Sequence, residues 1–417
     1  MADIPRLLVS DMKGNISFDT HLEAAGMKGG LISRLESSDL IRLPPTSKLF
    51  ILPSRSAIGC DTSTGRFMAM EGVFAVAAFL ASGYTATYSA AYKPIGSPKQ
   101  LPLFSYAAVC MRKNELYTAA IHIDRDRRHD CRYIDMIDVQ KGAMKLAKLF
   151  PKNRLIGHLK DCALIYGCPN AQNYFLSRYE APLPTSPSCN ASCAGCISFQ
   201  PDKRCPASQP RIKFVPTAEE IGQIALFHIE NTKRPIVSFG QGCEGEPLLE
   251  DRLIERSISL IRKQAKDGTI HMNSNGSRPE ALARLLDAGL DSVRISMNSA
   301  REIYYARYYK PRGYGFKDVL KSIKITKEKG AFVSINYLTM PGFTDAKDEF
   351  TAFRDLVSKY GIDMVQWRNL NYDPMRYFEE LKAWPKSSEL LGVKTVIDSL
   401  RKKFPRLRMG YFNPSLR

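Results

Sequence analysis

The stretch Cys189-Asn190-Ala191-Ser192-Cys193-Ala194-Gly195-Cys196 places three cysteines within eight residues, in the pattern C-x3-C-x2-C. Three thiolates can hold three irons of a cubane [4Fe–4S] cluster and leave the fourth iron open, so that a small molecule can coordinate and react there. Zinc is the alternative, because Cys205 could supply the fourth ligand that a structural zinc ion needs. On their own, these eight residues allow both kinds of site.

A second motif follows about 50 residues later, within Ser238–Leu248, where the chain reads Gly245-Glu246-Pro247. The cysteine stretch and this turn together resemble the radical S-adenosylmethionine (SAM) superfamily. Gly195 stands where that family usually has an aromatic residue, and Glu244 replaces the first glycine of its Gly-Gly-Glu-Pro motif. The resemblance implies that Cys189, Cys193 and Cys196 hold a [4Fe–4S] cluster whose open iron binds SAM. It also implies that Gly245 and Glu246 hold the methionine amino group of SAM.

Apolar strand-like segments and helical segments alternate over roughly residues 180–370, which predicts βα units and a parallel sheet. Strands are expected near 235–239, 269–273, 292–297, 332–339 and 364–370. A strand before the cysteine stretch brings the count to about six units. A doubly wound sheet would have the same rhythm, and the resemblance selects the partial (β/α)6 barrel. The predicted fold class is α/β.

Three domains are expected from these patterns. Residues 1–172 are predicted to form an N-terminal α+β domain, 173–372 the barrel, and 373–417 a short, helical, basic extension. Within the first domain we expect a buried helix at 73–81, a hairpin over 103–123, and helices near 136–150 and 154–166. The polar segment 124–130 is expected to be a solvated turn, with a phosphate or RNA contact as the less favoured alternative.

Polar residues alternate along two of the expected strands. His271, Asn273 and Asn275 share one strand face, and Arg294, Ser296 and Asn298 share a face of the next strand. Parallel barrels place their sites at the carboxyl ends of strands. The resemblance therefore makes Asn275, Ser296 and Asn298 candidates for binding the ribose and carboxylate of SAM. The same face continues on later strands with Ser334, Asn336, Gln366 and Arg368.

The remaining cysteines could form a second site. Cys162, Cys168, Cys205 and Cys243 together could hold an auxiliary iron–sulfur cluster or a metal, although free cysteines are often simply small buried hydrophobes. A further segment, 304–312, mixes tyrosines with Arg and Lys. It could stack nucleic-acid bases, but packing of an amphipathic helix on the barrel is favoured.

Charge and composition indicate which classes of partner the protein could bind. The 417 residues include 60 Lys and Arg against 42 Asp and Glu, a net charge of +18, which favours a polyanion such as RNA or an anionic substrate. The longest apolar run, 73–81, is too short to span a bilayer, so no membrane partner is expected. The N-terminus lacks the layout of a signal peptide, which predicts a cytoplasmic location.

The sequence thus predicts a radical SAM enzyme that reductively cleaves SAM to a 5′-deoxyadenosyl radical and abstracts hydrogen from a substrate. RNA or protein is preferred as substrate over a small metabolite, and a reducing donor such as flavodoxin or ferredoxin is expected. The N-terminal domain and the basic tail are expected to shape substrate access. The alternative is a non-catalytic iron–sulfur or zinc nucleic-acid-binding protein. This alternative is less favoured because a binder needs neither the Gly-Glu-Pro turn nor the polar strand faces.

Overall fold

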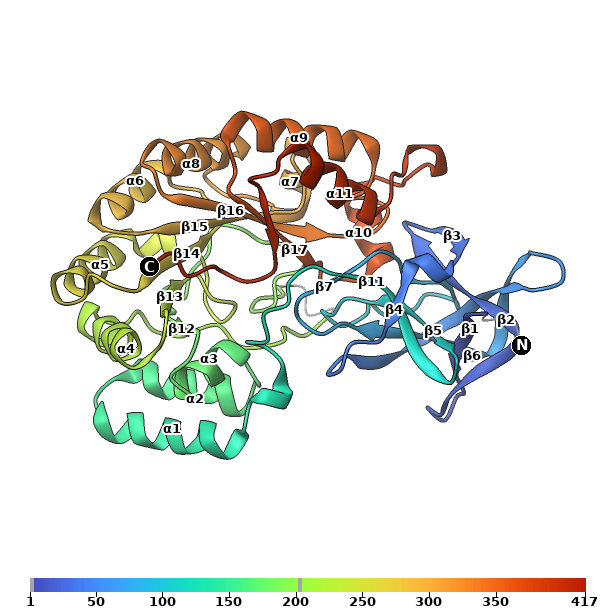
Figure 1. Cartoon of the computed structure of the whole chain (residues 1–417), viewed down its shortest axis with the longest axis horizontal. Helices are drawn as coiled ribbons and strands as arrows, with labels where there is room; N and C mark the ends of the chain where they lie inside the picture. Colours follow the sequence, from blue (N-terminus) through green and yellow to red (C-terminus); the bar gives the residue numbers. More distant parts are fainter. Residues whose placement is uncertain (1–3, 202–204) are drawn as a thin grey trace.

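Two β structures lie side by side in the computed structural model, which describes residues 4–201 and 205–417. In Figure 1 the N-terminal strands (blue) form one body, and a parallel sheet covered by helices forms the other. The two bodies meet at the carboxyl end of one barrel strand. There Thr85 Oγ1 donates to the carbonyl of Trp367 at 2.7 Å, and Ala86 N donates to Asn369 Oδ1 at 2.8 Å.

The N-terminal sheet has eleven strands, and all of its pairings are antiparallel. The strands are β1 (Arg6–Ser10), β2 (Ile16–Lys28), β3 (Leu31–Arg34), β4 (Leu40–Arg42), β5 (Lys48–Asp61), β6 (Phe67–Phe79), β7 (Tyr84–Ala86), β8 (Ser89–Ala90), β9 (Tyr92–Pro94), β10 (Ala107–Arg112) and β11 (Glu115–His122). The predicted hairpin is confirmed as β10 and β11. The predicted helix at 73–81 is wrong, because most of this segment lies in β6. That strand pairs with β5, β1 and β10, and Ala75–Ala78 are buried, so its apolar run is continuous rather than alternating.

Three helices connect the N-terminal sheet to the barrel: α1 (Met136–Leu149), α2 (Arg154–Leu164) and α3 (Pro169–Phe175). The first two confirm the predicted helices. Their buried side chains belong to the same hydrophobic cluster as the barrel strands. The preceding segment 124–130 is a loop with Arg125 and Arg127 exposed, as expected of a solvated turn, but Arg128 is only 7% exposed and donates to the carbonyl of Asn413 at 3.0 Å. The domain boundary at residue 172 stays a prediction.

The second sheet confirms the predicted partial barrel. Its seven strands are all parallel and lie in sequence order, namely β12 (Glu180–Pro182), β13 (Ile236–Phe239), β14 (Thr269–Ser274), β15 (Ser292–Met297), β16 (Phe332–Thr339), β17 (Met364–Asn369) and β18 (Arg408–Gly410). The helices between the strands are α4 (Ala218–Asn231), α5 (Asp251–Gln264), α6 (Pro279–Ala288), α7 (Glu302–Tyr309), α8 (Phe316–Glu328) and α9 (Lys347–Tyr360). Figure 1 shows α4, α5, α6, α8 and α9 along the outside of the sheet.

Local signals position several of these helices. Thr217 and Glu220 form a capping box at the start of α4. Residues Ser277-Arg278-Pro279-Glu280 have the form of a capping box, but they do not form one. Helix α6 begins with Pro279 at its first position, so its N-cap is Arg278, which has no side-chain cap. Gly289 ends α6 in the left-handed conformation, as expected for a helix C-cap.

The C-terminal extension is only partly helical. It contains α10 (Pro374–Leu381) and α11 (Val393–Lys403), and then adds β18 to the edge of the sheet. Beyond β18 the chain runs along the amino ends of the strands, where Leu416 N donates to Thr269 Oγ1 at 2.8 Å. The expectation that this tail shapes substrate access is therefore wrong. Thr269 is the first residue of β14, and sites in parallel barrels form at the opposite, carboxyl ends.

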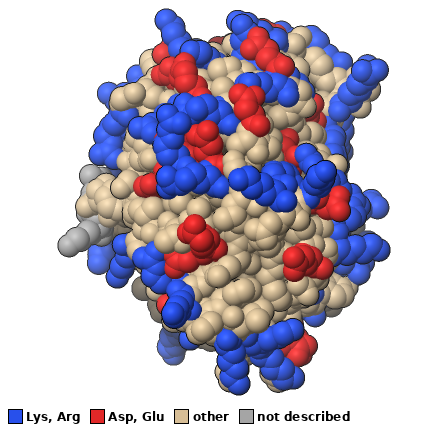
Figure 2. Space-filling view, turned by 90° about the vertical axis from the view of Figure 1, so that its left-hand side faces the viewer, with Lys and Arg blue, Asp and Glu red and all other residues tan. Residues whose placement is uncertain are grey.

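The outer surface mixes charges of both signs. On the face that Figure 2 shows, Lys and Arg side chains are interspersed with Asp and Glu. Arg284 of α6, for example, pairs with Asp251 of α5. Among the helices that the structure describes, none combines the length and apolar character that crossing a bilayer requires.

Candidate active site

The three cysteines of the 189–196 stretch lie in the loop between β12 and α4, and each is partly buried. We call residues 189–196 the cysteine loop. Helix α7 holds it, because Ala194 N donates to the carbonyl of Tyr308 at 3.0 Å and Ser192 N donates to that of Tyr309 at 2.9 Å. Beyond α7, the Arg312 guanidinium donates to the Cys189 carbonyl at 2.8 Å.

These contacts decide between the two interpretations of the aromatic segment 304–312. Tyr305, Tyr308 and Tyr309 are each at most 4% exposed, and the rings of Tyr305 and Tyr309 stack on each other. The tyrosines therefore pack as a helix under the cysteine loop instead of offering rings for bases to stack on. Sequence reasoning favoured packing here but did not anticipate that this helix supports the cysteines.

The structure also shows why glycine fits at position 195. A Cβ at this position would lie 2.8 Å from the Tyr308 hydroxyl oxygen and 3.6 Å from Cδ2 of Tyr372. Tyr308 comes from α7 and Tyr372 from the segment after β17. Aromatic side chains distant in sequence thus take the space beside the cysteine loop.

The Gly245-Glu246-Pro247 turn lies directly against the residues that precede the cysteines. A Cβ on Gly245 would lie 1.8 Å from the Ser188 carbonyl oxygen, so only glycine allows this approach. Glu246 N donates to the same carbonyl at 2.8 Å. The two motifs that the sequence singled out therefore form one structural unit.

Glu246 accepts hydrogen bonds from β14 and from the residue that follows it. Its Oε1 accepts from Ser274 Oγ at 2.6 Å, and its Oε2 accepts from Asn275 N at 2.8 Å. Asn275 in turn donates through Nδ2 to Asn190 Oδ1 of the cysteine loop at 2.8 Å. Burial raises the pKa of Glu246 to about 7, since its hydrogen bonds only partly offset the loss of water. This carboxyl changes charge near neutral pH.

Glu244 is a structural residue that sequence reasoning missed. Its Oε2 accepts from Thr185 N at 2.8 Å and from Ser186 N at 3.0 Å. Its Oε1 accepts from Gly240 N and Gln241 N, both at 2.7 Å. The buried carboxylate thus ties the segment before the cysteines to the turn after β13. The signal was the departure from the family motif, because an acid replaced a glycine there.

The strand faces carry unsatisfied polar atoms. Ser296 is partly exposed, whereas Asn298 is fully buried and donates to the Tyr377 hydroxyl at 3.2 Å. Among the described residues, buried atoms without a hydrogen-bond partner include the following on or beside the barrel strands: Arg294 Nε, Asn298 Oδ1, Ser334 Oγ, Asn336 Oδ1 and Arg368 Nε. Leaving such atoms unpaired is costly, so this face suits a polar ligand that would satisfy them.

The thiols fit a cluster better than a single ion. Burial, together with the nearby Cys196 and Cys189, raises the pKa of Cys193 well above its ordinary value, so the loop needs a bound cation to hold three thiolates. Within the described residues, no set of ligand atoms from this loop lies within 4.8 Å of one another, as one shared ion would require. Cys205, the proposed fourth zinc ligand, instead donates to the Pro206 carbonyl.

Of the four cysteines considered for a second site, the structure brings Cys162 and Cys243 together and adds His158, which the sequence had not suggested. The thiol of Cys168 lies outside this group, and so does that of Cys205.

Comparison with known proteins agrees with this site. The sequence profile of the radical SAM superfamily matches residues 183–354. The chain is 26% identical over 179 residues to the FeMo cofactor biosynthesis protein NifB of Klebsiella pneumoniae, covering 39% of this chain and 38% of that protein. It is 31% identical over 160 residues to a probable GTP 3′,8-cyclase of Methanococcus maripaludis, covering 38% of this chain and 49% of the relative. The chain therefore spans less than half the length of these curated relatives.

Among solved structures, the Streptococcus suis protein SuiB bound to S-adenosylmethionine covers 73% of this chain and 70% of its own. It is 13% identical, with a TM-score of 0.40. The family profile covers both the cysteine loop and the Gly-Glu-Pro turn. Residues 183–354 of this chain are thus similar to the radical SAM superfamily. The cofactors that this family match implies are a [4Fe–4S] cluster and SAM.

Proposed function

We propose that this protein is a radical SAM enzyme that reductively cleaves SAM and abstracts a hydrogen atom from a substrate. The observation that carries the proposal is the hydrogen-bonded unit formed by the cysteine loop, Glu246 and Asn275 next to the ends of β13 and β14. A non-catalytic binding protein has no need of such a unit.

Each part of this unit has a role in the proposal. Cys189, Cys193 and Cys196 would hold the cluster, and Gly245 and Glu246 would receive the ammonium of SAM. Asn275, Ser296 and Asn298 would receive its ribose and carboxylate. When bound, the cluster supplies the electron that breaks a C–S bond of SAM. The chain's own residues orient SAM and keep water away, as the burial of Glu246 and Asn298 supports.

The test is anaerobic reconstitution of the full chain with iron and sulfide, followed by reduction with dithionite or with flavodoxin or ferredoxin, the donors we propose. We expect 5′-deoxyadenosine to form from SAM in the wild type. We expect none from a Cys193→Ser variant, and normal amounts from Cys131→Ser, whose thiol is exposed. Failure of the reduced, iron-loaded wild type to cleave SAM would refute the proposal.

The finer proposal is that the substrate carries anionic groups, with RNA ranked ahead of protein and a small anionic metabolite last. Two partly buried arginines, Arg294 and Arg368, support it. Burial and the nearby Arg368 lower the pKa of Arg294 to about 9, more than the nearby Glu180 raises it, so an anionic group that approached these two arginines would be favoured. The net charge of +18 favours a polyanion in the same way. SAM cleavage should increase on addition of the true substrate. Stimulation by neutral peptides, with none by RNA or anionic metabolites, would contradict this ranking.

A further inference from the structure

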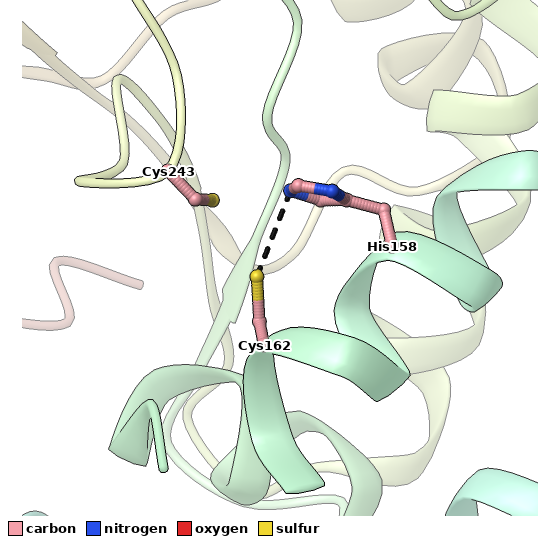
Figure 3. Close-up of side chains that lie close together, drawn as sticks. All are labelled: His158, Cys162 and Cys243. Atoms are coloured by element: carbon pink, nitrogen blue, oxygen red, sulfur yellow. Dashed lines mark hydrogen bonds between the residues drawn. The ribbon is translucent and has the colours of Figure 1, made fainter. Parts of the chain in front are cut away.

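A second group of metal-ligand side chains lies beside the proposed active site. His158 and Cys162 are four residues apart on α2, so both point from one face of that helix. Figure 3 shows them directed toward Cys243, which comes from the turn that follows β13. One ligand atom from each residue lies within 4.8 Å of the other two. None of these side chains has a part in the proposed SAM chemistry.

The spacing of the ligand atoms fits one tetrahedral ion. Cys162 Sγ and His158 Nε2 share a hydrogen bond of 3.6 Å, which Figure 3 draws as a dashed line. Zinc bonds of about 2.3 Å to sulfur and about 2.0 Å to nitrogen, at the tetrahedral angle, separate the two ligand atoms by about 3.5 Å. The observed pair therefore already has the separation of two ligands on one zinc ion. An iron–sulfur cluster would spread its ligands over several metal atoms instead.

The surroundings of these three side chains favour a preformed metal site over a chance contact. Cys162 is 3% exposed and Cys243 4%, whereas His158 is partly exposed and offers a route for an ion to enter. The backbone on both sides is held in place. Cys243 O accepts from Ile212 N, and Cys162 O accepts from Cys168 N, each at 2.8 Å. The second of these bonds brings Cys168 next to the site, at the start of α3.

We propose that His158, Cys162 and Cys243 bind one zinc ion, with Cys168 or a water as the fourth ligand. Two thiolates and an imidazole are a donor set that zinc prefers, and zinc needs no electron donor to remain bound. Cys243 precedes Glu246 by three residues. The ion would therefore cross-link α2 to the turn that carries the proposed SAM-binding carboxyl. Its role would be to position that turn.

The test measures zinc, iron and sulfide per chain in the full-length protein, purified anaerobically and loaded with its cluster. We expect one zinc per chain in the wild type and in Cys189→Ser, which separates this site from the cysteine loop. We expect at least a tenfold loss of zinc in Cys162→Ser and Cys243→Ser, with the iron content unchanged. Cys131→Ser is the matched control, and it should keep both metals.

X-ray absorption at the zinc edge of the wild type needs no variant to fold. It should report two or three sulfur ligands at about 2.3 Å and at least one nitrogen ligand at about 2.0 Å. A four-sulfur zinc environment would overturn the proposal, as would wild-type protein without zinc. The proposal would also be overturned if the wild type held more iron and sulfide than one [4Fe–4S] cluster contains and Cys162→Ser lost that excess. This result would indicate an auxiliary cluster. A Cys162–Cys243 disulfide found by mass spectrometry in the anaerobic protein would overturn it as well.

Discussion

Glu246 and Gly195 are the two single residues whose chemistry most directly governs the proposed site. The first is a buried carboxyl, which accepts hydrogen bonds from the uncharged donors Ser274 Oγ, Asn275 N and Leu248 N. The second is a glycine whose missing side chain makes room for a tyrosine hydroxyl. Each yields a measurable expectation.

SAM affinity should rise with pH because of Glu246. Its pKa is raised to about 7, so the carboxyl is largely neutral at pH 6 and charged at pH 8. The charged form attracts an ammonium, so the SAM dissociation constant should fall roughly tenfold over that range. Glu246→Gln should bind SAM about 10- to 100-fold more weakly at pH 8, with a flat pH profile. Anaerobic equilibrium dialysis measures both quantities.

Glu71→Gln, which changes an exposed residue of β6, is the control and should retain the wild-type pH profile. If Glu246→Gln kept the slope between pH 6 and pH 8, another group would be responsible for it.

Gly195→Ala should loosen the cysteine loop. The new Cβ would crowd the Tyr308 hydroxyl at 2.8 Å and the Asn371 carbonyl at 3.3 Å. We expect a loss of about 1–2 kcal/mol in the free energy of unfolding. The Tyr308→Phe background should recover part of that loss, because it removes one of the crowding atoms. Chemical unfolding of the four proteins of this cycle measures the coupling.

Gly157→Ala is the matched control for that substitution. Gly157 lies within α2, and a Cβ there would meet no atom within 4 Å. Removing a helical glycine should leave stability unchanged or raise it by about 0.5–1 kcal/mol. An equal loss from both glycine substitutions would show that crowding at position 195 is not the cause.

At the scale of elements, one carboxylate joins two helices. Glu220 closes the capping box of α4 and also accepts from the Arg154 guanidinium of α2 at 2.7 and 2.9 Å. Asn153, the N-cap of α2, donates to the Glu220 carbonyl at 2.9 Å. These bonds fix where α2 starts, and with it the position of His158 and Cys162 one and two turns further along.

Glu220→Gln should lower the free energy of unfolding by about 1–2 kcal/mol at pH 7. The expected loss is no larger because Arg154 is half exposed, so solvent screens its attraction to Glu220. The Arg154 guanidinium lowers the pKa of Glu220 to about 2. The stabilisation is therefore present above the ordinary glutamate pKa of 4.5 and is lost as the pH falls from there toward 2. Urea unfolding should show that the difference in the free energy of unfolding between the variant and the wild type is smaller at pH 4 than at pH 7.

The exposed pair Lys324–Glu328 on α8 provides the comparison. Glu328→Gln should change stability by less than about 0.5 kcal/mol at either pH. A similarly small effect of Glu220→Gln would mean that the contact between α2 and α4 does not depend on this carboxylate.

At the scale of the whole molecule, the last residues close the end of the barrel that lies away from the cysteine loop. Asn413 is 3% exposed, donates to Glu180 Oε1 at 2.8 Å and accepts from Gln366 Nε2 at 2.9 Å. It links the first strand of the sheet, β12, to β17. The chain's C-terminal segment thus completes a buried polar network instead of serving as a basic arm.

Asn413→Ala should cost about 2–4 kcal/mol, because it leaves buried polar partners unpaired on both strands. SAM binding should be nearly unchanged, since the residues that we propose to bind SAM lie at the other end of the barrel. Urea unfolding and equilibrium dialysis provide the two readouts. Ser415→Ala, at a residue whose hydroxyl bonds only to the nearby Arg417 carbonyl, should be neutral in both. If Asn413→Ala weakened SAM binding as strongly as it lowered stability, the C-terminal segment would lie closer to the active site than proposed.

Local patterns were sufficient to predict the barrel. Its strands repeat as short apolar segments separated by amphipathic helices, and signals such as Thr217, Glu220 and Gly289 act within a few residues of where they stand. The same reasoning failed for β6, because an apolar run without alternation does not distinguish a buried helix from a strand that is covered on both faces. The C-terminal strand was missed for a similar reason, since its three residues carry little pattern of their own.

The sequence by itself was enough to identify the three cysteines of the cysteine loop and Gly245, which lies against Ser188. It was also enough to predict the alternation of strands and helices that forms a parallel sheet. These depend on the spacing of residues that are near one another in the chain. Only the tertiary structure decided that Tyr308 fills the space beside Gly195, that Asn413 closes the barrel, and that His158 and Cys162 meet Cys243. Each of these is a contact between segments far apart in the chain. The spacing of residues in the sequence does not predict such contacts, because they form only when the folded chain packs these segments together.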